Sequence, residues 1–216
     1  ASIDELSDKL EAALEGGKQL QQAVLDVIRD SYGTSSRVVF NGDGYSEEWH
    51  NEAEQRGLLN LRTTPDALPE LVSDSSKQAF SRYEVLSERE LESRFEVLTE
   101  QYVVNINIEA EIAAGIARTM ILPAALRHLV LLKESDAERL VAETEGIVDE
   151  LVSAIFDLEK ANEEHPEDEG LAHARYMRDV VVPAMDRTRA AADQLERVVA
   201  DDLWPLPKYQ EMLFIK

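Results

Sequence analysis

The 216-residue sequence contains no cysteine, few aromatic residues and half as many basic as acidic residues. Without cysteine the chain can form no disulfide and offers no thiolate to a metal or a substrate. The 22 basic residues against 44 acidic ones leave a net charge of −22, which repels nucleic-acid phosphates and anionic lipids. We therefore expect neither nucleic acid nor a membrane among its partners.

The sequence also lacks a long apolar run and a recognisable signal peptide. Residues 120–126 are one of the longest apolar runs, yet the run is short and ends in charge. It falls well below the ~20 residues of a membrane-spanning helix. The chain opens at Ala1 directly on a helical pattern, which we interpret as a piece of a longer protein.

The residues that are present favour helices around a core. Hydrophobic residues make up 44% of the chain, and alanine, leucine and glutamate, which are strong helix formers, are abundant. We predict an all-α fold, with an elongated antiparallel three-helix bundle of long kinked helices and a smaller N-terminal helical part containing one short strand. Residues 1–86 are expected to form the N-terminal part, 87–203 the bundle and 204–216 an apolar docking tail.

Within the N-terminal part, the spacing of apolar residues predicts helices over residues 2–15 and 18–32, separated by two glycines. Residues 37–40 are the only convincing β-like run. The glycines of residues 41–44 then favour a sharp turn with positive φ.

Two short helices are expected after this turn. Ser46 is placed to cap the first, with Trp49 and Ala53 on its inner face. Thr64 is placed to cap the second, with Pro65 at its first helical position, a favoured place for proline.

Three long amphipathic patterns follow, at residues 87–133, 135–165 and 177–198. Ser87 with Glu90, and Ser135 with Glu138, have the spacing of capping boxes and predict the starts of the first two helices. Because the connections are short, the helices should run up, down and up.

Two prolines interrupt the predicted bundle. Pro123 and Pro183 each remove one backbone hydrogen bond and should kink their helices. Counting residues from the predicted turns places both prolines at nearly the same height, so we expect the bundle to bend as a unit.

The C-terminal tail is rich in large apolar side chains and broken by prolines. Left exposed it would favour aggregation, so it should dock on this domain or on a neighbour. The candidate interface residues are Trp204, Leu206, Tyr209, Leu213 and Phe214.

No catalytic, cofactor-binding or metal-binding set emerges from the sequence. Glu47 with His50, and Glu169 with His173, have spacings found in metal sites, but each pair is more simply part of a solvated acidic face. Residues 41–44 lack the lysine and serine or threonine of a phosphate-binding loop, so a structural turn is favoured. No nucleophile can be assigned.

Several motifs resemble the C-terminal region of type III glutamine synthetases. They are residues 38–49 (VVFNGDGYSEEW), 56–58 (RGL), 60–64 (NLRTT), 86–94 (LSERELESR), 121–124 (ILPA) and 204–209 (WPLPKY). They span nearly the whole chain, whereas residues 135–169 carry little of the resemblance.

The resemblance implies a cytoplasmic parent enzyme that joins ammonia to glutamate using ATP and divalent metal, in stacked rings of subunits. The metal, ATP and glutamate sites of such enzymes lie upstream, so no functional residue carries over and this fragment alone is expected to be inactive. Its implied partners are the catalytic domain of the same chain and neighbouring subunits. A free-standing helical adaptor and a carboxylate-bridged metal-binding bundle remain as alternatives.

Overall fold

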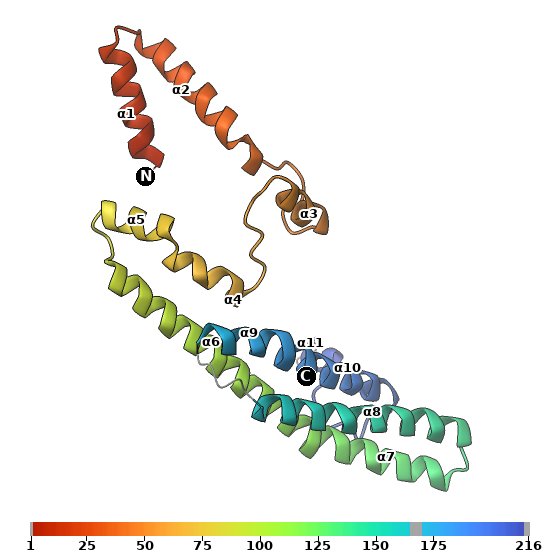
Figure 1. The fold of residues 1–216 in the computed structure, drawn as a ribbon. Helices are drawn as coiled ribbons and strands as arrows, with labels where there is room; N and C mark the ends of the chain where they lie inside the picture. Colours follow the sequence, from red (N-terminus) through yellow and green to blue (C-terminus); the bar gives the residue numbers. More distant parts are fainter. Residues whose placement is uncertain (1, 165–169, 214–216) are drawn as a thin grey trace. The chain divides into compact units, whose positions relative to one another are not determined.

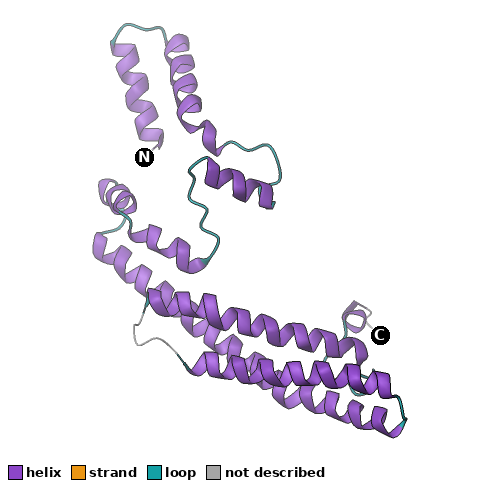
Figure 2. Cartoon of the chain, turned by 45° about the vertical axis from the view of Figure 1, so that its right-hand side comes forward, coloured by secondary structure: helices purple, strands orange, loops and turns teal. Residues whose placement is uncertain are grey.

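The chain is helical throughout the part that the structure describes. The computed structural model describes residues 2–164 and 170–213, and within these ranges it contains helices, turns and loops but no strand (Figure 1 and Figure 2). The all-α prediction is confirmed. The chain divides into two compact units, Ala1–Glu88 and Arg89–Lys216, and each is described by itself.

The first unit consists of short helices. In chain order they are α1 (Ser2–Glu15), α2 (Leu20–Ser35), the 3₁₀ turn η1 (Ser36–Val38), α3 (Glu47–Gln55), α4 (Thr64–Ala67), the 3₁₀ turn η2 (Leu68–Val72) and α5 (Asp74–Arg82). α1 and α2 form a hairpin whose connection contains Gly17 at φ 83°, a conformation that glycine adopts readily. Both helices predicted before residue 37 are thus present.

The predicted strand at residues 37–40 is wrong. Ser36–Val38 forms a 3₁₀ turn that continues α2, and Val39 after it has extended backbone angles. A strand at residues 37–40 would have no neighbouring strand to pair with in the described part of the chain. The backbone carbonyl groups of this segment accept hydrogen bonds from a side chain instead. Arg56 Nη1 donates to the carbonyl oxygens of Arg37 and Val39 at 3.0 and 2.8 Å.

The helix caps of this unit agree with the sequence at one position and differ at another. Ser46 caps α3 as predicted, since its Oγ accepts a hydrogen bond from the Trp49 backbone N at 3.3 Å. α4 is capped one residue earlier than predicted, at Thr63, so Thr64 is its first residue and Pro65 follows in the first turn. The earlier start still leaves proline where its missing N–H costs nothing.

The second unit is built from long helices. In chain order they are α6 (Glu88–Ile116), the π-helical turn η3 (Ala117–Ile121), α7 (Leu122–Glu134), α8 (Glu138–Glu163), α9 (Leu171–Tyr176), the π-helical turn η4 (Met177–Val181), α10 (Val182–Val198) and the short α11 (Tyr209–Leu213). α6, η3 and α7 are continuous, as are α9, η4 and α10, so three helical rods result (Figure 2).

The predicted capping box at Ser135 and Glu138 does not form. Ser135 instead ends α7, where its Oγ donates to the Leu132 carbonyl at 2.9 Å, and the residue at the cap of α8 is Ala137. Serine can bond to a carbonyl behind it as readily as to an N–H ahead of it, so the spacing alone did not decide between the two. Asp136 turns the chain at φ 54°.

Each interrupting proline follows a π-helical turn. η3 ends two residues before Pro123, and η4 ends two residues before Pro183. Both sequences share an arginine five residues before the proline and an alanine directly after it. A π turn accommodates an extra residue and removes the ordinary hydrogen-bond pattern at the place where proline cannot donate.

Both π turns contact α8. Arg118 of η3 pairs with Glu159 of α8, and Met177 and Val181 of η4 share a buried cluster with Leu158. The two turns thus contact adjacent residues of α8, and a common height of the two interruptions stays a prediction. Whether the bundle bends there as one unit stays a prediction.

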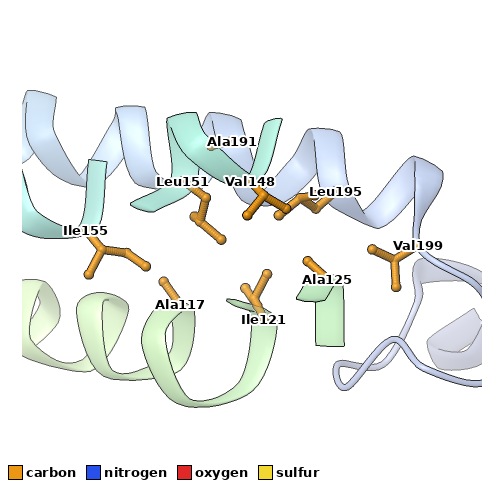
Figure 3. Close-up of a cluster of buried hydrophobic side chains, with 9 residues drawn as sticks. All are labelled: Ala117, Ile121, Ala125, Val148, Leu151, Ile155, Ala191, Leu195 and Val199. Atoms are coloured by element: carbon orange, nitrogen blue, oxygen red, sulfur yellow. The ribbon is translucent and has the colours of Figure 1, made fainter. Parts of the chain in front are cut away.

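The core of the second unit lies between the three rods. Figure 3 shows its larger buried cluster, Ala117, Ile121, Ala125, Val148, Leu151, Ile155, Ala191, Leu195 and Val199, which draws on all three. A smaller cluster contains Ala110, Ala114, Leu158, Met177 and Val181. The many alanines let the helix backbones approach closely, and the branched side chains fill the space between them.

The rod Glu88–Glu134 is long and apolar enough to cross a membrane. This differs from the expectation that no segment has the length and composition of a membrane-spanning helix. Its most apolar window has a mean hydropathy of 1.4, and 28% of that window is buried within the chain. One such helix is weak evidence for a membrane span, because core helices of soluble proteins also meet these limits. One face of this rod is a core face, since Ala117, Ile121 and Ala125 pack in the larger cluster.

Candidate interaction surfaces

The first part of the C-terminal tail packs on this chain's own bundle. After α10 the backbone turns, and the N–H groups of Leu203 and Trp204 donate to the Ala200 carbonyl at 3.0 and 3.1 Å. Leu203, Trp204 and Leu206 then pack against the larger core cluster. Two of the five candidate interface residues, Trp204 and Leu206, therefore lie against the domain itself.

The last described part of the tail is exposed. Lys208 forms an ion pair with Asp201, and its backbone N donates to Glu211 Oε2 at 3.1 Å at the start of α11. Beyond it, Met212 and Leu213 are 62% and 63% exposed. Phe214 and the side chain of Tyr209 lie outside what the structure describes. Leu213 is thus the candidate interface residue that the structure shows at the surface.

The turn at residues 41–44 is held by its own side chains. Asp43 Oδ1 accepts from the Tyr45 backbone N at 2.9 Å, and Ser46 Oγ donates to the Asp43 carbonyl at 2.7 Å. An aspartate that bonds its own backbone two residues ahead is a common device of tight turns. The carboxylate is thereby used in building the turn.

Gly42 of this turn is needed for space, and the expected positive φ is absent at both glycines. The residues with left-handed backbones include Gly57 but neither Gly42 nor Gly44. A Cβ on Gly42 would lie 2.6 Å from the Phe40 ring. That ring stacks on Trp49 with centroids 4.6 Å apart. Phe40, Trp49 and the Arg56 guanidinium, 5.5 Å from the Trp49 ring, form a stack that fixes the turn against α3.

The candidate metal ligands have other partners or are not brought together. Arg62 Nη2 donates to Glu47 Oε1 at 2.6 Å and holds the pKa of that carboxyl below its ordinary value. His50 Nδ1 lies 3.2 Å from Asn60 Oδ1. Glu169 lies outside the described residues. Over residues 2–164 and 170–213, no group of three histidine, cysteine, aspartate or glutamate side chains could hold a metal ion.

Polar contacts between helices could not be predicted from the sequence, and those of Asn162 and Arg118 are examples. Asn162 Nδ2 of α8 donates to Asn107 Oδ1 of α6 at 2.9 Å. Arg118 Nε and Nη2 donate to Glu159 Oε1 and Oε2 at 2.7 and 2.5 Å, and its guanidinium lies 4.9 Å from the Phe156 ring. The asparagines that interrupt the apolar pattern near residue 107 were a visible signal, but their partner came from a helix distant in sequence.

An apolar groove runs between α1 and α2. It has a volume of about 290 Å³ and is lined chiefly by Ile3, Leu6, Leu10, Val24, Val27 and Ile28. The sequence predicts this apolar face of each helix. It does not show that, within the chain, the two faces leave a groove open to solvent.

Comparisons with known proteins place the chain in a family. The family model described as the glutamine synthetase C-terminal domain matches residues 23–138, more than half of the chain. The type-3 glutamine synthetase of Dictyostelium discoideum is 35% identical over 91% of this chain and 29% of that protein.

Two bacterial relatives agree with this assignment. Glutamine synthetases of Bacteroides fragilis (strain YCH46) and Butyrivibrio fibrisolvens are 28% and 30% identical over 99% and 92% of the chain. The chain spans 32% and 30% of the lengths of those two relatives. A match that covers most of this chain, together with the family model, confirms the resemblance found in the motifs. The chain therefore belongs to the glutamine synthetase C-terminal domain family.

Proposed function

We propose that this chain is the non-catalytic C-terminal helical domain of a glutamine synthetase, an ATP-dependent glutamate–ammonia ligase of cytoplasmic nitrogen assimilation. Its role would be to pack subunits or to shape the oligomer. The observation that carries the proposal is coverage: nearly all of this chain aligns with less than a third of each relative. The remaining two thirds or more of each relative lies outside the region that aligns with this chain, and we place the catalytic domain there.

The candidate ligands named from the sequence have other partners where the structure describes them. Glu47 is bonded to Arg62, Asp43 is bonded within its turn, and no cluster of three potential metal ligands occurs in the described ranges. If the parent enzyme uses ATP and metal ions, as the family implies, their site belongs to the region upstream of this domain.

The second unit offers surfaces suited to packing. We infer that residues 87–203 act as an elongated three-helix bundle, since one buried cluster draws on all three rods. The outer face of the first rod carries exposed aliphatic side chains at Val97, Val104, Ile108, Ile112 and Val130. Exposed apolar side chains that recur along a helix are found at protein interfaces. We assign this face to contact with neighbouring subunits and not to a lipid bilayer, because the opposite face of the rod is a protein core.

Two truncations of the full-length protein test the packing role. Ending the chain after Lys208 removes α11 and its exposed Leu213 but keeps Trp204 and Leu206 on the core. We expect a smaller or more readily dissociated oligomer by light scattering, with the melting temperature of the domain unchanged. Ending it after Asp202 should also lower the melting temperature. An unchanged oligomer in both truncated proteins would contradict a role of the tail in assembly.

A further inference from the structure

The hairpin of α1 and α2 buries almost none of its own apolar surface. Within α2 the one buried residue is Ala23, and no residue of α1 is recorded as buried. Ile3 and Ile28, which line the groove between the helices, are 84% and 58% exposed. The groove is lined mainly by aliphatic side chains.

Two short helices with exposed apolar faces need another surface that packs against those faces. Helices of 14 and 16 residues are marginal in water on their own, because most helical stability in proteins comes from packing an apolar face. Between the two helices the structure records one ion pair, Lys9 with Asp30, at 2.7 Å and exposed. Such a pair contributes little. The apolar residues at regular spacing therefore imply a surface that packs over them.

Electrostatic repulsion disfavours a second copy of this chain as the surface that packs on α1 and α2. The chain carries a net charge of −22, and α1 has the acidic residues Asp4, Glu5, Asp8, Glu11 and Glu15 against the single lysine Lys9. Bringing two such hairpins together would place like charges around an apolar centre, which is unfavourable. A surface with basic side chains around an aliphatic centre would be complementary.

The length of the relatives points to a different occupant. Each relative is about three times as long as the region it shares with this chain, and the shared region is a C-terminal domain. In such a protein the upstream region precedes α1 in the chain, and Ile3, near the start of α1, lines the groove. A covalently tethered surface reaches its site at high effective concentration.

We propose that the groove between α1 and α2 is the docking site for the catalytic region that precedes this domain in the same polypeptide. The contact is aliphatic at its centre, against Leu6, Leu10 and Ile28, and is ringed by lysine or arginine side chains of the upstream region that face the acidic residues of α1. This inference rests on the proposed function, because it takes the upstream region to be present and catalytic.

Amide hydrogen exchange measured on this chain and on the full-length protein tests the proposal. In the isolated chain the amides of α1 and α2 should exchange fast, at any protein concentration, because the hairpin is uncovered. In the full-length protein they should exchange at least about tenfold more slowly, since opening then requires undocking. The amides of α8, whose core lies within the chain, should exchange equally in both.

A matched pair of variants assigns the protection to the groove. Ile28→Glu in the full-length protein should return exchange of α1 and α2 to the rate in the isolated chain. Leu140→Glu is the control, since Leu140 is 52% exposed against 58% for Ile28 but lies on α8, outside the face assigned to subunit contacts. It should leave exchange of α1 and α2 unchanged.

Each other outcome overturns the docking proposal. Equal exchange of α1 and α2 in the two proteins would show that nothing upstream covers them. Protection that appears in the isolated chain as its concentration rises would assign the groove to a second copy. Failure of the proposed function is separate, because it would appear as a full-length protein without glutamine synthesis, whatever its exchange pattern.

Discussion

Gly42 lies where the backbone passes close to the Phe40 ring, so that a Cβ at this position has no room. Gly42→Ala would place a Cβ 2.6 Å from the ring carbon, so the Phe40–Trp49 stack must shift. We expect a loss of about 1–3 kcal/mol in the free energy of unfolding, measured by urea with tryptophan fluorescence.

Gly44→Ala is the control for that measurement. No atom lies within 4 Å of a Cβ at Gly44, and its φ is not positive. The substitution should be neutral or slightly stabilising, because it reduces the freedom of the unfolded chain. Equal destabilisation by both substitutions would rule out the close approach as the reason for glycine at position 42.

The Glu47–Arg62 pair predicts a specific pH dependence. The hydrogen bond from Arg62 lowers the pKa of the Glu47 carboxyl from its ordinary 4.5. A carboxylate with a lowered folded-state pKa stabilises the fold above its unfolded-state pKa and loses that effect as pH falls through the lowered value. Glu47→Gln should therefore lower the urea midpoint slightly at neutral pH and leave it unchanged in acid below the lowered pKa.

Glu48→Gln provides the comparison, because it removes the same charge from the same turn of α3. The structure records no hydrogen bond between Glu48 and Arg62. Both substitutions change the interaction with the helix dipole alike, so the difference between the two variants reports the Arg62 bond. If the two variants have the same urea midpoint at neutral pH, the bond makes no contribution.

At residue scale the sequence predicts a helix-capping serine well only where its hydroxyl has one possible backbone partner. Ser46 precedes a clear helix, and its hydroxyl accepts the N–H of Trp49 as expected. Ser135 stands between two helices and bonds backward to Leu132. The two choices differ by little energy, so the surrounding turn, which the sequence does not display, decides.

At the scale of elements, the helices could be predicted and their irregularities only in part. Apolar spacing located every long helix, because a face that packs on a core must recur at the helical period. Pro123 and Pro183 showed that hydrogen bonding is interrupted, but a kink and a π turn both satisfy that constraint. The β-like run at residues 37–40 does not form a strand, because no other strand in the part of the chain that the structure describes pairs with it. Whether a pairing strand exists depends on the whole fold and not on the run itself.

A pair of isoleucine substitutions tests the packing of the rods. Ile155 of α8 is 1% exposed in the larger core cluster, whereas Ile108 of α6 is 47% exposed. Ile155→Ala should lower the free energy of unfolding by about 2–5 kcal/mol, since it leaves a cavity. Ile108→Ala should change it by no more than about 0.5 kcal/mol in the isolated chain. Similar losses at both positions would show that the core is wrongly placed.

At the scale of the whole molecule, the sequence predicts membership in a family better than it predicts surfaces. The motifs near Trp49, Pro123 and Trp204 lie far apart along the chain, and together they identify the family that the comparisons confirm. The candidate interface was less predictable. Trp204 and Leu206 turn back onto this chain's own core, whereas Leu213 stays exposed. Apolar composition alone does not show whether a side chain packs on its own chain or stays exposed for a partner, since either contact would bury it.

We propose that this domain belongs to a glutamine synthetase and does not itself perform the chemistry. The most direct measurement is ATP-dependent formation of glutamine from glutamate and ammonia, by this chain and by the full-length protein at equal molar concentration. We predict glutamine formation by the full-length protein and none by this chain. Glutamine formation by this chain alone, or an inactive but folded full-length protein, would contradict the account.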